Sequence, residues 1–318
     1  MTNRRDFIRG GAAFGGVFAA ASLPAAEPPS VDLRGRGWYE RLQLAYHTVE
    51  IGLPKPFSVL HISDTHLTAA YPHETLWTDF SRSRTQIFGG LQEHSLAESL
   101  KWAKQTVDCV IHTGDLIDFV SEANLDLVKK YFGPSADLAC TSGNHEFHRL
   151  PKEKGVKPTE AYNDEGREAL ERAFGRDLRF AATVVNGVNF VTVENVYGYY
   201  TEYQVRRFKA EVAKGLPIVL CQHVPILTDG IRIAAERFRT MGAKIGAEPL
   251  PKPAGDARRQ LEDPVTRDFL AYLRTEKLLK CVLSGHFHHF AEDRFSPTAM
   301  QYVVGGNYLL HGQELIFT

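Results

Sequence analysis

The sequence predicts a layered α/β domain built around a mixed central β-sheet, and three observations support this prediction. Short apolar segments rich in Val, Ile and Leu alternate with longer segments in which apolar residues recur every three or four positions. The first kind is typical of buried strands and the second of amphipathic helices. Hairpin patterns occur late in the chain, so antiparallel neighbours are expected beside parallel ones. No internal repeat is present, which indicates a single domain over residues 57–318.

The first 26 residues are expected to lie outside the folded domain. Two adjacent arginines, Arg4 and Arg5, precede Phe7 and an apolar, Gly- and Ala-rich stretch from Gly10 to Leu23. This layout resembles a twin-arginine export signal. The apolar stretch is shorter than the roughly 20 residues that span a bilayer, so no permanent membrane span is expected.

The export signal implies contact with the export machinery and a periplasmic or extracellular location. Cleavage is expected after Ala26, so that residues 1–26 form the twin-arginine signal peptide. A disordered basic tail is the alternative. Residues 27–56 are then expected to form a linker and an N-terminal strand at 42–49, which two prolines close.

Five short apolar segments are predicted to form the core strands. Each is too short and too apolar for a surface helix, and each ends in a small polar loop that contains Asp, Asn or His. The segments are Phe57–Ser63, Val107–Thr113, Leu138–Ser142, Ile218–Gln222 and Leu279–Ser284.

Helices are predicted between these strands, because apolar residues recur there at three- and four-residue spacing. One of them ends at Gly215, a residue that stops helices, and another begins at Pro264, a residue favoured in the first helical turn. The predicted helices are Leu96–Thr106, Glu122–Phe132, Glu165–Phe174, Thr201–Lys214 and Pro264–Lys277.

A β-hairpin is predicted in the second half of the chain. The apolar strands Phe180–Val185 and Val188–Val193 are joined by Asn186 and Gly187, the pair suited to a type I′ turn. The C-terminal segment Met300–Phe317 is predicted to form further strands, broken at two consecutive glycines.

The balance of charge limits the class of partner. With 37 Lys and Arg against 38 Asp and Glu, the chain has a formal net charge of -1. Proteins that bind nucleic acid or anionic membranes generally show a basic excess, so no stable nucleic-acid partner is expected. A small phosphorylated substrate needs only local positive charge, which bound metal ions can supply.

The four cysteines are predicted to be buried free thiols. Cys109, Cys140, Cys221 and Cys281 each lie inside a short apolar run, and no pair has CxxC spacing. Their even number in an exported protein leaves a disulfide framework as the alternative.

Polar residues suited to metal binding follow each of the five predicted core strands. Loops at the carboxyl ends of strands are where open α/β sheets place their sites. In an extended segment, residues at i and i+2 point to the same side, so Asp64 and His66 can converge. The same holds for His286 and His288. A glycine precedes three of the candidate ligands and permits a sharp turn that directs the ligand into the site.

Seven of these loop residues are candidate metal ligands. Carboxylate, amide and imidazole groups without thiolate favour Mn, Fe or Zn over a soft-metal or iron–sulfur centre. Seven ligands exceed what one four-coordinate ion uses, whereas two ions that share a bridging carboxylate would use them all. The sequence therefore predicts two divalent or trivalent metal ions. The candidates are Asp64, His66, Asp115, Asn144, His223, His286 and His288.

The ordered motifs DxH, GDxxD, GNHE, a lone His and GHxH resemble those of the calcineurin-like metallophosphoesterase superfamily. The resemblance covers residues 57 to about 290, and all five motifs occur in the expected order. It implies the metallo-dependent phosphatase-like fold, a four-layer α/β/β/α sandwich of two mixed β-sheets flanked by helices. It also implies that Asp115 bridges the two metals. The first metal would be bound by Asp64, His66 and His288, and the second by Asn144, His223 and His286.

The resemblance also implies two catalytic residues. His145 matches the family's histidine that lies beside the metals without binding them, and Asp118 matches the carboxylate that orients this histidine. A phosphate ester would then be hydrolysed by in-line attack of a metal-bridging hydroxide, with His145 assisting the departure of the alcohol.

The choice of substrate within the superfamily rests on finer features. The GNHE motif and a GHxH close to the C-terminus resemble the cyclic-nucleotide phosphodiesterase-like group, which favours a phosphodiester. A phosphomonoesterase at the same site is the first alternative. Purple acid phosphatases usually carry Tyr at the position of Asp118, and the mild charge balance disfavours a nuclease. A non-catalytic metal-containing binding protein is the alternative from a different class.

Several further residues allow both a structural and a functional interpretation. His61 and His112 lie within predicted strands and are expected to be hydrogen-bonded core residues, and Glu146 is expected to be structural. His148 and His289 follow motif residues closely, so a place in the pocket is an alternative to packing.

Two aromatic or basic segments could serve the substrate. Residues 68–90 could form a substrate cap in which Arg82 or Arg84 grips a phosphate, or a solvated surface insertion. Tyr197, Tyr199 and Tyr200 could stack on a ring of the substrate, although packing is the commoner use of such side chains.

Overall fold

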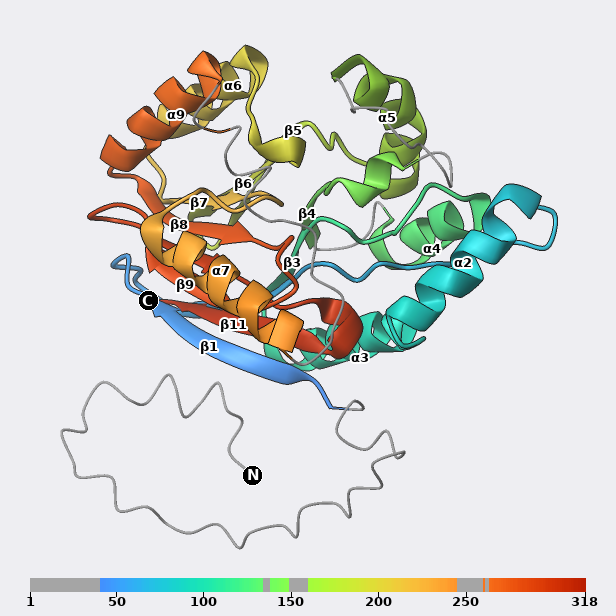
Figure 1. Ribbon diagram of the computed structural model, residues 1–318. Coiled ribbons are helices and arrows are strands. Elements are labelled where there is room, and N and C mark those ends of the chain that lie inside the picture. Colours follow the sequence, from blue (N-terminus) through green and yellow to red (C-terminus); the bar gives the residue numbers. More distant parts are fainter. Residues whose placement is uncertain (1–40, 134–137, 149–159, 245–259, 261–262) are drawn as a thin grey trace, which may run out of the picture.

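Two mixed β-sheets form the centre of the molecule (Figure 1). The computed structural model describes residues 41–133, 138–148, 160–244, 260 and 263–318. The predicted signal peptide and most of the predicted linker therefore lie outside the described residues.

The first sheet has five strands in the order β1-β11-β2-β3-β4. Strand β11 runs antiparallel to β2, and the other neighbours are parallel. The first and last described strands of the chain thus lie side by side, with Gln43 opposite His311. The strands are β1 Gln43–Val49, β2 Phe57–Ile62, β3 Cys109–Thr113, β4 Leu138–Thr141 and β11 His311–Phe317.

The second sheet has six strands in the order β5-β6-β7-β8-β10-β9. Its two outer pairs are antiparallel and its inner pairs are parallel. The predicted hairpin forms the β5–β6 pair, in which Asn186 and Gly187 both have positive φ, as a type I′ turn requires. The strands are β5 Phe180–Val185, β6 Val188–Val193, β7 Ile218–Cys221, β8 Leu279–Ser284, β9 Ala291–Arg294 and β10 Met300–Val303.

The two sheets pack face to face through apolar side chains. Val59 and Ile111 of the first sheet lie in one cluster with Phe190, Val219 and Cys281 of the second, and all five side chains are fully buried. Because helices cover the outer faces as well, most core strands are buried on both sides. This arrangement explains their nearly continuous apolar sequences.

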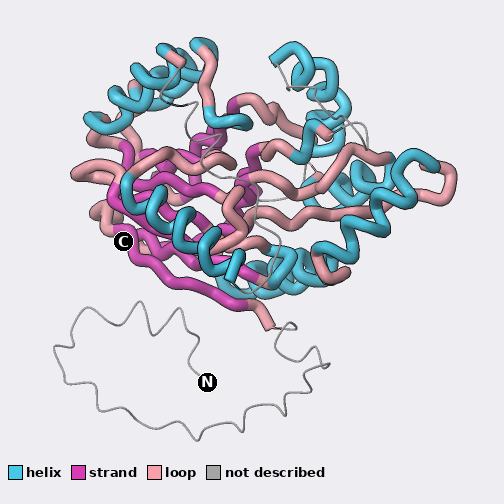
Figure 2. Tube along the Cα trace, in the orientation of Figure 1, coloured by secondary structure: helices cyan, strands magenta, loops and turns pink. Residues whose placement is uncertain are grey.

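Helices cover both outer faces, as Figure 2 shows with strands in magenta between helices in cyan. Helices α3 Gln92–Thr106, α4 Glu122–Phe132 and α5 Glu160–Phe174 pack on the first sheet. Helices α6 Glu202–Val212 and α9 Pro264–Thr275 pack on the second. The four-layer sandwich of two mixed sheets flanked by helices is therefore confirmed. None of the described helices is both long and apolar enough to cross a membrane.

Three elements were absent from the prediction: α2 Thr75–Ile87, α7 Asp229–Lys244 and β9 Ala291–Arg294. Among the residues of helix α2 only Trp77 is buried, so this helix lies at the surface of the molecule. Strand β9 alternates between partly buried and exposed residues of polar character and lies at a sheet edge. Helices α3 and α5 begin at Gln92 and Glu160, several residues before the predicted starts.

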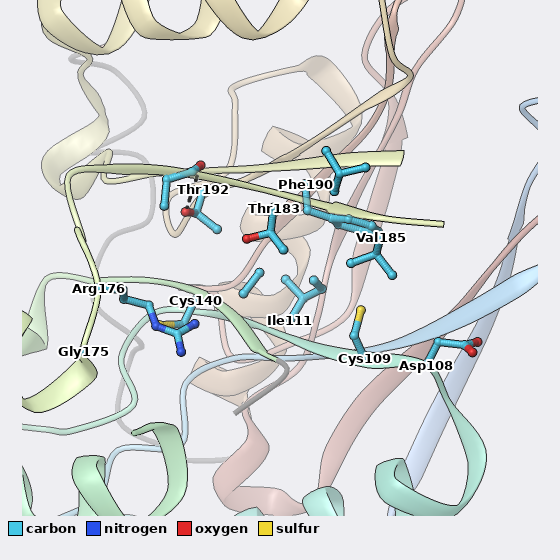
Figure 3. A pocket seen from close by; sticks show the side chains of 13 residues that line it. Asp108, Cys109, Ile111, Cys140, Gly175, Arg176, Thr183, Val185, Phe190 and Thr192 are labelled. Atoms are coloured by element: carbon cyan, nitrogen blue, oxygen red, sulfur yellow. Dashed lines mark hydrogen bonds between the residues drawn. The ribbon is translucent and has the colours of Figure 1, made fainter. Parts of the chain in front are cut away.

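The prediction of buried thiols is confirmed, since Cys109, Cys140, Cys221 and Cys281 are all buried and none of them forms a disulfide. Burial raises the pKa of Cys140 to about 12. Cys109 and Cys140 also line a cavity of about 460 Å³ between the two sheets, together with Ile111, Arg176 and Phe190 (Figure 3). None of the candidate metal ligands lines this cavity.

Candidate metal centre

The five predicted loops meet at one end of the two sheets. Among the described residues, three groups of side chains each offer ligand atoms that all lie within 4.8 Å of one another. Two of them include Asp115, and the third consists of His66, Asp118 and His145. Strands β2 and β3 of the first sheet supply the aspartates and His66, whereas β7 and β8 of the second supply the other histidines. The first group is Asp64, His66, Asp115 and His288, and the second is Asp115, His223 and His286.

The backbone at these residues is left-handed. The φ angles are 55° at Asp64, 51° at His66, 53° at Asp115, 69° at His286 and 58° at His288. The expectation that an extended backbone makes the pairs converge is therefore wrong, although the pairs do converge. A non-glycine residue in this region costs about 1–3 kcal/mol, so the surrounding fold must hold each of these residues in place.

One glycine of the site is required by close approach. A Cβ atom at residue 285 would collide with the side chains of Ser63 and Asp64. The absence of that atom lets the backbone N–H of His286 donate to the Asp64 carboxylate, at 2.9 Å from Oδ2 and 3.1 Å from Oδ1. This hydrogen bond joins the first loop of one sheet to the last loop of the other.

Glu146 holds the loop that carries Asp115. Its Oε2 accepts hydrogen bonds from the backbone N–H groups of Asp115 at 2.9 Å and Gly143 at 2.6 Å. Its Oε1 accepts from Leu116 at 2.6 Å and Ile117 at 3.2 Å. Burial and the nearby Asp115 raise the pKa of Glu146 to about 7, and these N–H groups oppose the rise. The structural interpretation of Glu146 is confirmed, and its side chain is fully buried.

The first group surrounds the Nε2 atom of His66. That atom lies 3.0 Å from His288 Nε2 and 3.7 Å from Asp115 Oδ2. His288 Nε2 lies 3.3 Å from Asp64 Oδ1. The other ring nitrogen of His66, Nδ1, faces Asp118 Oδ1 at 2.8 Å, so the proton belongs on Nδ1 and leaves Nε2 as a ligand.

The second group shares the same oxygen of Asp115. His223 Nε2 lies 3.2 Å from Asp115 Oδ2 and 3.1 Å from His286 Nδ1. His223 Nδ1 donates to the backbone oxygen of Thr113 at 2.8 Å, which leaves Nε2 available as a ligand. Asp115 Oδ2 therefore faces both groups, while Oδ1 accepts the backbone N–H of His145 at 2.9 Å.

Asn144 supplies a test of whether these residues fit metal ions. Its Oδ1 atom is buried and meets no hydrogen-bond donor among the described residues. A buried acceptor without a partner is costly, and a cation would satisfy it. Two pairs of imidazole nitrogens also face each other at 3.0–3.1 Å, which is close enough for both nitrogens of a pair to bind one cation. The donor set therefore fits two metal ions of the Mn, Fe or Zn class.

The electrostatics of the cluster favour positive charge. Burial opposes ionisation of Asp115, but His223 and His145 outweigh it and hold the pKa of Asp115 well below its usual range. Burial likewise opposes protonation of His223, yet the Asp115 carboxylate raises the pKa of His223 to about 10. The buried aspartates thus attract cations.

His145 lies beside the cluster, where the motif comparison placed it. Its Nδ1 lies 2.8 Å from Asp118 Oδ1 and 3.1 Å from the Asp118 backbone oxygen. Burial lowers the pKa of His145, but Asp115 and Asp118 outweigh this effect and raise it to about 9. Its ring centroid is 4.7 Å from that of His66.

The sequence did not predict three contacts around His145 and Asp118. Asp118 contacts His66 as well as His145, and Arg84 donates to both carboxylate oxygens of Asp118. Phe88 stacks on the ring of His66. A long-range pair such as Arg84 and Asp118 leaves no local signal, because the two residues belong to different elements 34 positions apart.

The remaining histidines divide between core and pocket. The side-chain amide of Gln313 donates to His61 Nδ1, and His61 Nε2 bonds Thr113. His112 bonds Thr65, so the prediction of hydrogen-bonded core residues is confirmed. The ring of His148 lies 4.4 Å from that of His145, beside the site. His289 Nδ1 bonds the Phe287 backbone oxygen at 2.7 Å.

Arg82, in the segment 68–90, and Tyr200 both have structural partners. Most of the segment is helix α2, and Arg82 pairs with Asp79 on its exposed side. Tyr200 is buried, donates to Gln222 Oε1 at 2.5 Å and packs on Phe269, so the packing interpretation holds for this tyrosine.

Fold and site together define a metal-dependent phosphoric ester hydrolase. The sequence profile of the family described as calcineurin-like phosphoesterase matches residues 57–290. The chain therefore belongs to the calcineurin-like phosphoesterase family. A search of curated proteins found no matching relative.

Three solved structures resemble the fold. A dimetal phosphatase from Danio rerio is 17% identical with a TM-score of 0.48, over 79% of this chain and 88% of that chain. The calcineurin-like phosphoesterase YfkN from Bacillus subtilis is 13% identical with a TM-score of 0.36, over 80% and 82%. The 5'-nucleotidase from Candida albicans is 12% identical with a TM-score of 0.41, over 84% of this chain and 47% of that chain.

Proposed function

We propose that this chain is a two-metal phosphodiesterase in which Asp115 bridges the metal ions. The observation that carries the proposal is the position of Asp115 Oδ2, which faces His66 at 3.7 Å on one side and His223 at 3.2 Å on the other. A carboxylate oxygen between two clusters of imidazole nitrogens is the arrangement that a binuclear centre requires.

The ligands divide as the motifs suggest. Asp64, His66 and His288 would hold the first ion, since their ligand atoms lie together with that of Asp115. The second ion would be held by Asn144, His223 and His286, for which the unpartnered Oδ1 of Asn144 is the support. Each ion would then take ligands from both sheets.

The residues around the centre would divide the chemistry between them. Bound metal ions would neutralise the charge of the phosphate and acidify the water that serves as nucleophile. His145 would donate the proton at Nε2 to the departing alcohol oxygen, because its Nδ1 faces Asp118. Asp118 would keep the ring of His145 oriented and stabilise its protonated form.

Two sequence motifs support a phosphodiester as the substrate in preference to a phosphomonoester. The GNHE motif, Gly143 to Glu146, and the GHxH motif, Gly285 to His288, resemble those of the cyclic-nucleotide phosphodiesterase-like group. A phosphomonoesterase at the same site is the second candidate, because the metal ligands would be the same.

Hydrolysis and metal content measured together test the proposal. The purified chain, loaded separately with Mn, Fe and Zn, is assayed on bis-p-nitrophenyl phosphate and on p-nitrophenyl phosphate. We expect two metals per chain and faster turnover of the diester. Asp115→Asn should lose both metal and activity. Two metals without turnover on any substrate would instead favour a non-catalytic binding protein.

We further propose that the chain is exported by the twin-arginine route to the periplasm or beyond. The support is the Arg4-Arg5 pair before the apolar stretch, and no permanent membrane anchor is part of the proposal. A fusion of residues 1–40 to a reporter that is active only after folded export would be delivered outside the cytoplasm. Replacement of both arginines by lysine should retain the reporter inside, and unchanged export would contradict this route.

A further inference from the structure

Helix α2 ends beside the metal centre and brings Arg84 to Asp118. The Nε atom of Arg84 lies 2.5 Å from Asp118 Oδ2, and one terminal nitrogen lies 2.8 Å from Oδ1. This is a two-point ion pair in which the planar guanidinium matches the planar carboxylate. Asp118 is fully buried, and 23% of the Arg84 side chain is exposed.

The Asp118 carboxylate contacts two histidines of the site. Its Oδ1 lies 2.8 Å from Nδ1 of His66 and 2.8 Å from Nδ1 of His145. One histidine is a proposed metal ligand and the other the proposed proton donor. A rotation of the Asp118 carboxylate about its Cβ–Cγ bond would therefore disturb both rings.

Arg84 is itself held against the same histidine. Its guanidinium carbon lies 4.8 Å above the ring centroid of Phe88, at the end of α2. The Phe88 ring stacks on His66, with centroids 4.4 Å apart and planes 17° apart. Helix α2 thus contacts His66 through its ring face and, by way of Asp118, through its Nδ1 atom.

We propose that Arg84 is a positioning residue, which locks the plane of the Asp118 carboxylate so that His145 is aimed at the leaving oxygen. The inference rests on the proposed role of His145. In that step the oxygen of a hydroxide, formed when water releases a proton to solvent, bonds to phosphorus. The P–O bond to the alcohol breaks, its electron pair stays on the alcohol oxygen, and that oxygen takes the Nε2 proton of His145, which solvent then replaces. Arg84 touches none of the reacting atoms.

This role predicts a loss that depends on the leaving group. A p-nitrophenolate leaving group departs with little help from an acid, because it is a stable anion. Phenolate is a poorer leaving group and depends more on receiving a proton. Loss of Arg84 should therefore slow diphenyl phosphate more than bis-p-nitrophenyl phosphate. A purely structural defect would slow both substrates alike.

The experiment compares Arg84→Gln, Arg84→Lys and Arg82→Gln in the full, zinc-loaded chain. Arg82 lies on the same helix and pairs with Asp79 on the exposed side, so its variant is the matched control. For Arg84→Gln we expect kcat to fall about tenfold on diphenyl phosphate and under about threefold on bis-p-nitrophenyl phosphate. The loss should be smaller than the loss on removing the general acid itself, because His145 is still present. Arg84→Lys keeps the positive charge but cannot donate to both oxygens of Asp118 in one plane, so it should retain only part of the original kcat on diphenyl phosphate.

Two further measurements separate the possible failures. In ¹⁵N-histidine-labelled, zinc-loaded protein, the Nδ1–H signals of His66 and His145 should shift in Arg84→Gln and stay in place in Arg82→Gln. In the double variant with His145→Ala, Arg84→Gln should cause no further selective loss on diphenyl phosphate. These results would show that Arg84 affects the reaction through His145.

The outcomes that would overturn the inference differ from those that would overturn the function. If His145→Ala shows the selective loss and Arg84→Gln does not, the positioning role fails and the proposed function stands. If Arg84→Gln raises KM equally for both substrates with kcat unchanged, Arg84 grips the phosphate instead. If His145→Ala itself shows no selectivity, the proposed role of His145 fails.

Discussion

At the scale of single residues, the two oxygens of Asp115 have different partners. Oδ1 accepts the backbone N–H of His145, whereas Oδ2 faces His66 and His223. The first contact fixes the rotation of the carboxylate, and the second leaves one oxygen between the two groups of ligands. The position that Asp115 Oδ2 would need as a bridge in the proposed centre is thus set by a backbone hydrogen bond from the neighbouring GNHE loop.

His145 is expected to act in chemistry and not in metal binding. The change His145→Ala should lower kcat by about 10²–10⁴ on a diester whose leaving group needs a proton, because the acid is removed. Metal content measured by mass spectrometry should stay near two ions per chain, since no proposed ligand is changed. A loss of metal in this variant would refute the assigned role.

Glu146 is expected to be a structural requirement of the site. In Glu146→Gln, the amide N–H₂ would face backbone N–H groups that now donate to a carboxylate oxygen. Leaving such buried donors without an acceptor should lower the free energy of unfolding by about 3 kcal/mol. Urea denaturation measures the loss. Glu98→Gln, at a site that pairs with Lys101 on the surface, should change it little.

At the scale of elements, strong local signals made much of the fold predictable. The five core strands, the Asn186-Gly187 hairpin and helix α4 at Glu122–Phe132 follow the prediction closely, because buried strands and a type I′ turn have marked sequences. Helix α2 could not be predicted in this way. Only Trp77 among its residues is buried, and its contacts with the site are made by Arg84 and by Phe88 at its C-terminal end.

The residue types of the site could be predicted from the sequence, but their backbone conformation could not. Motif order predicted that Asp64, His66 and the distant His286 and His288 lie close together. In the structure the ligand atoms of Asp64, His66 and His288 form one group with Asp115, and that of His286 lies in the second group with Asp115 and His223. The left-handed conformations of these residues could not be deduced, because a positive φ is rare for any residue other than glycine, although Asp and His adopt it more often than most. They arise from contacts between loops of different strands.

The N-terminus of α6 offers a test at this scale. Thr201 accepts the backbone N–H of Gln204, and the Gln204 side chain accepts the backbone N–H of Thr201, a complete capping box. Thr201→Ala should lower the free energy of unfolding by about 1 kcal/mol, as loss of a helix cap does. Thr201→Ser keeps the hydroxyl and should cost much less. Equal losses in both variants would show that the methyl group, not the cap, matters.

At the scale of the whole molecule, the proposed metal centre joins the two sheets. Ligands after β2, β3 and β4 belong to the first sheet, and ligands after β7 and β8 belong to the second. In the absence of cations, two buried aspartates and several imidazoles lie at this junction. Metal binding should therefore stabilise the packing of one sheet on the other, and not the loops alone.

Metal removal tests this link between site and stability. Treatment with a chelator should lower Tm, and restoring the metal at about 100 times its Kd should recover about 2.7 kcal/mol of stability for each of the two sites. Differential scanning calorimetry measures both steps. Asp115→Asn is the control, because it should show the low Tm of the stripped protein with or without added metal. An unchanged Tm on stripping would mean that the metals do not join the sheets.

The most direct measurement of the central claim is anomalous X-ray scattering from crystals of the metal-loaded chain. We predict two anomalous peaks about 3.5–4 Å apart, one on each side of Asp115 Oδ2. The peak beside His66 and His288 and the peak beside His223 and Asn144 should both lie within bonding distance of that oxygen. A single peak, or two peaks of which neither contacts Asp115, would contradict the account.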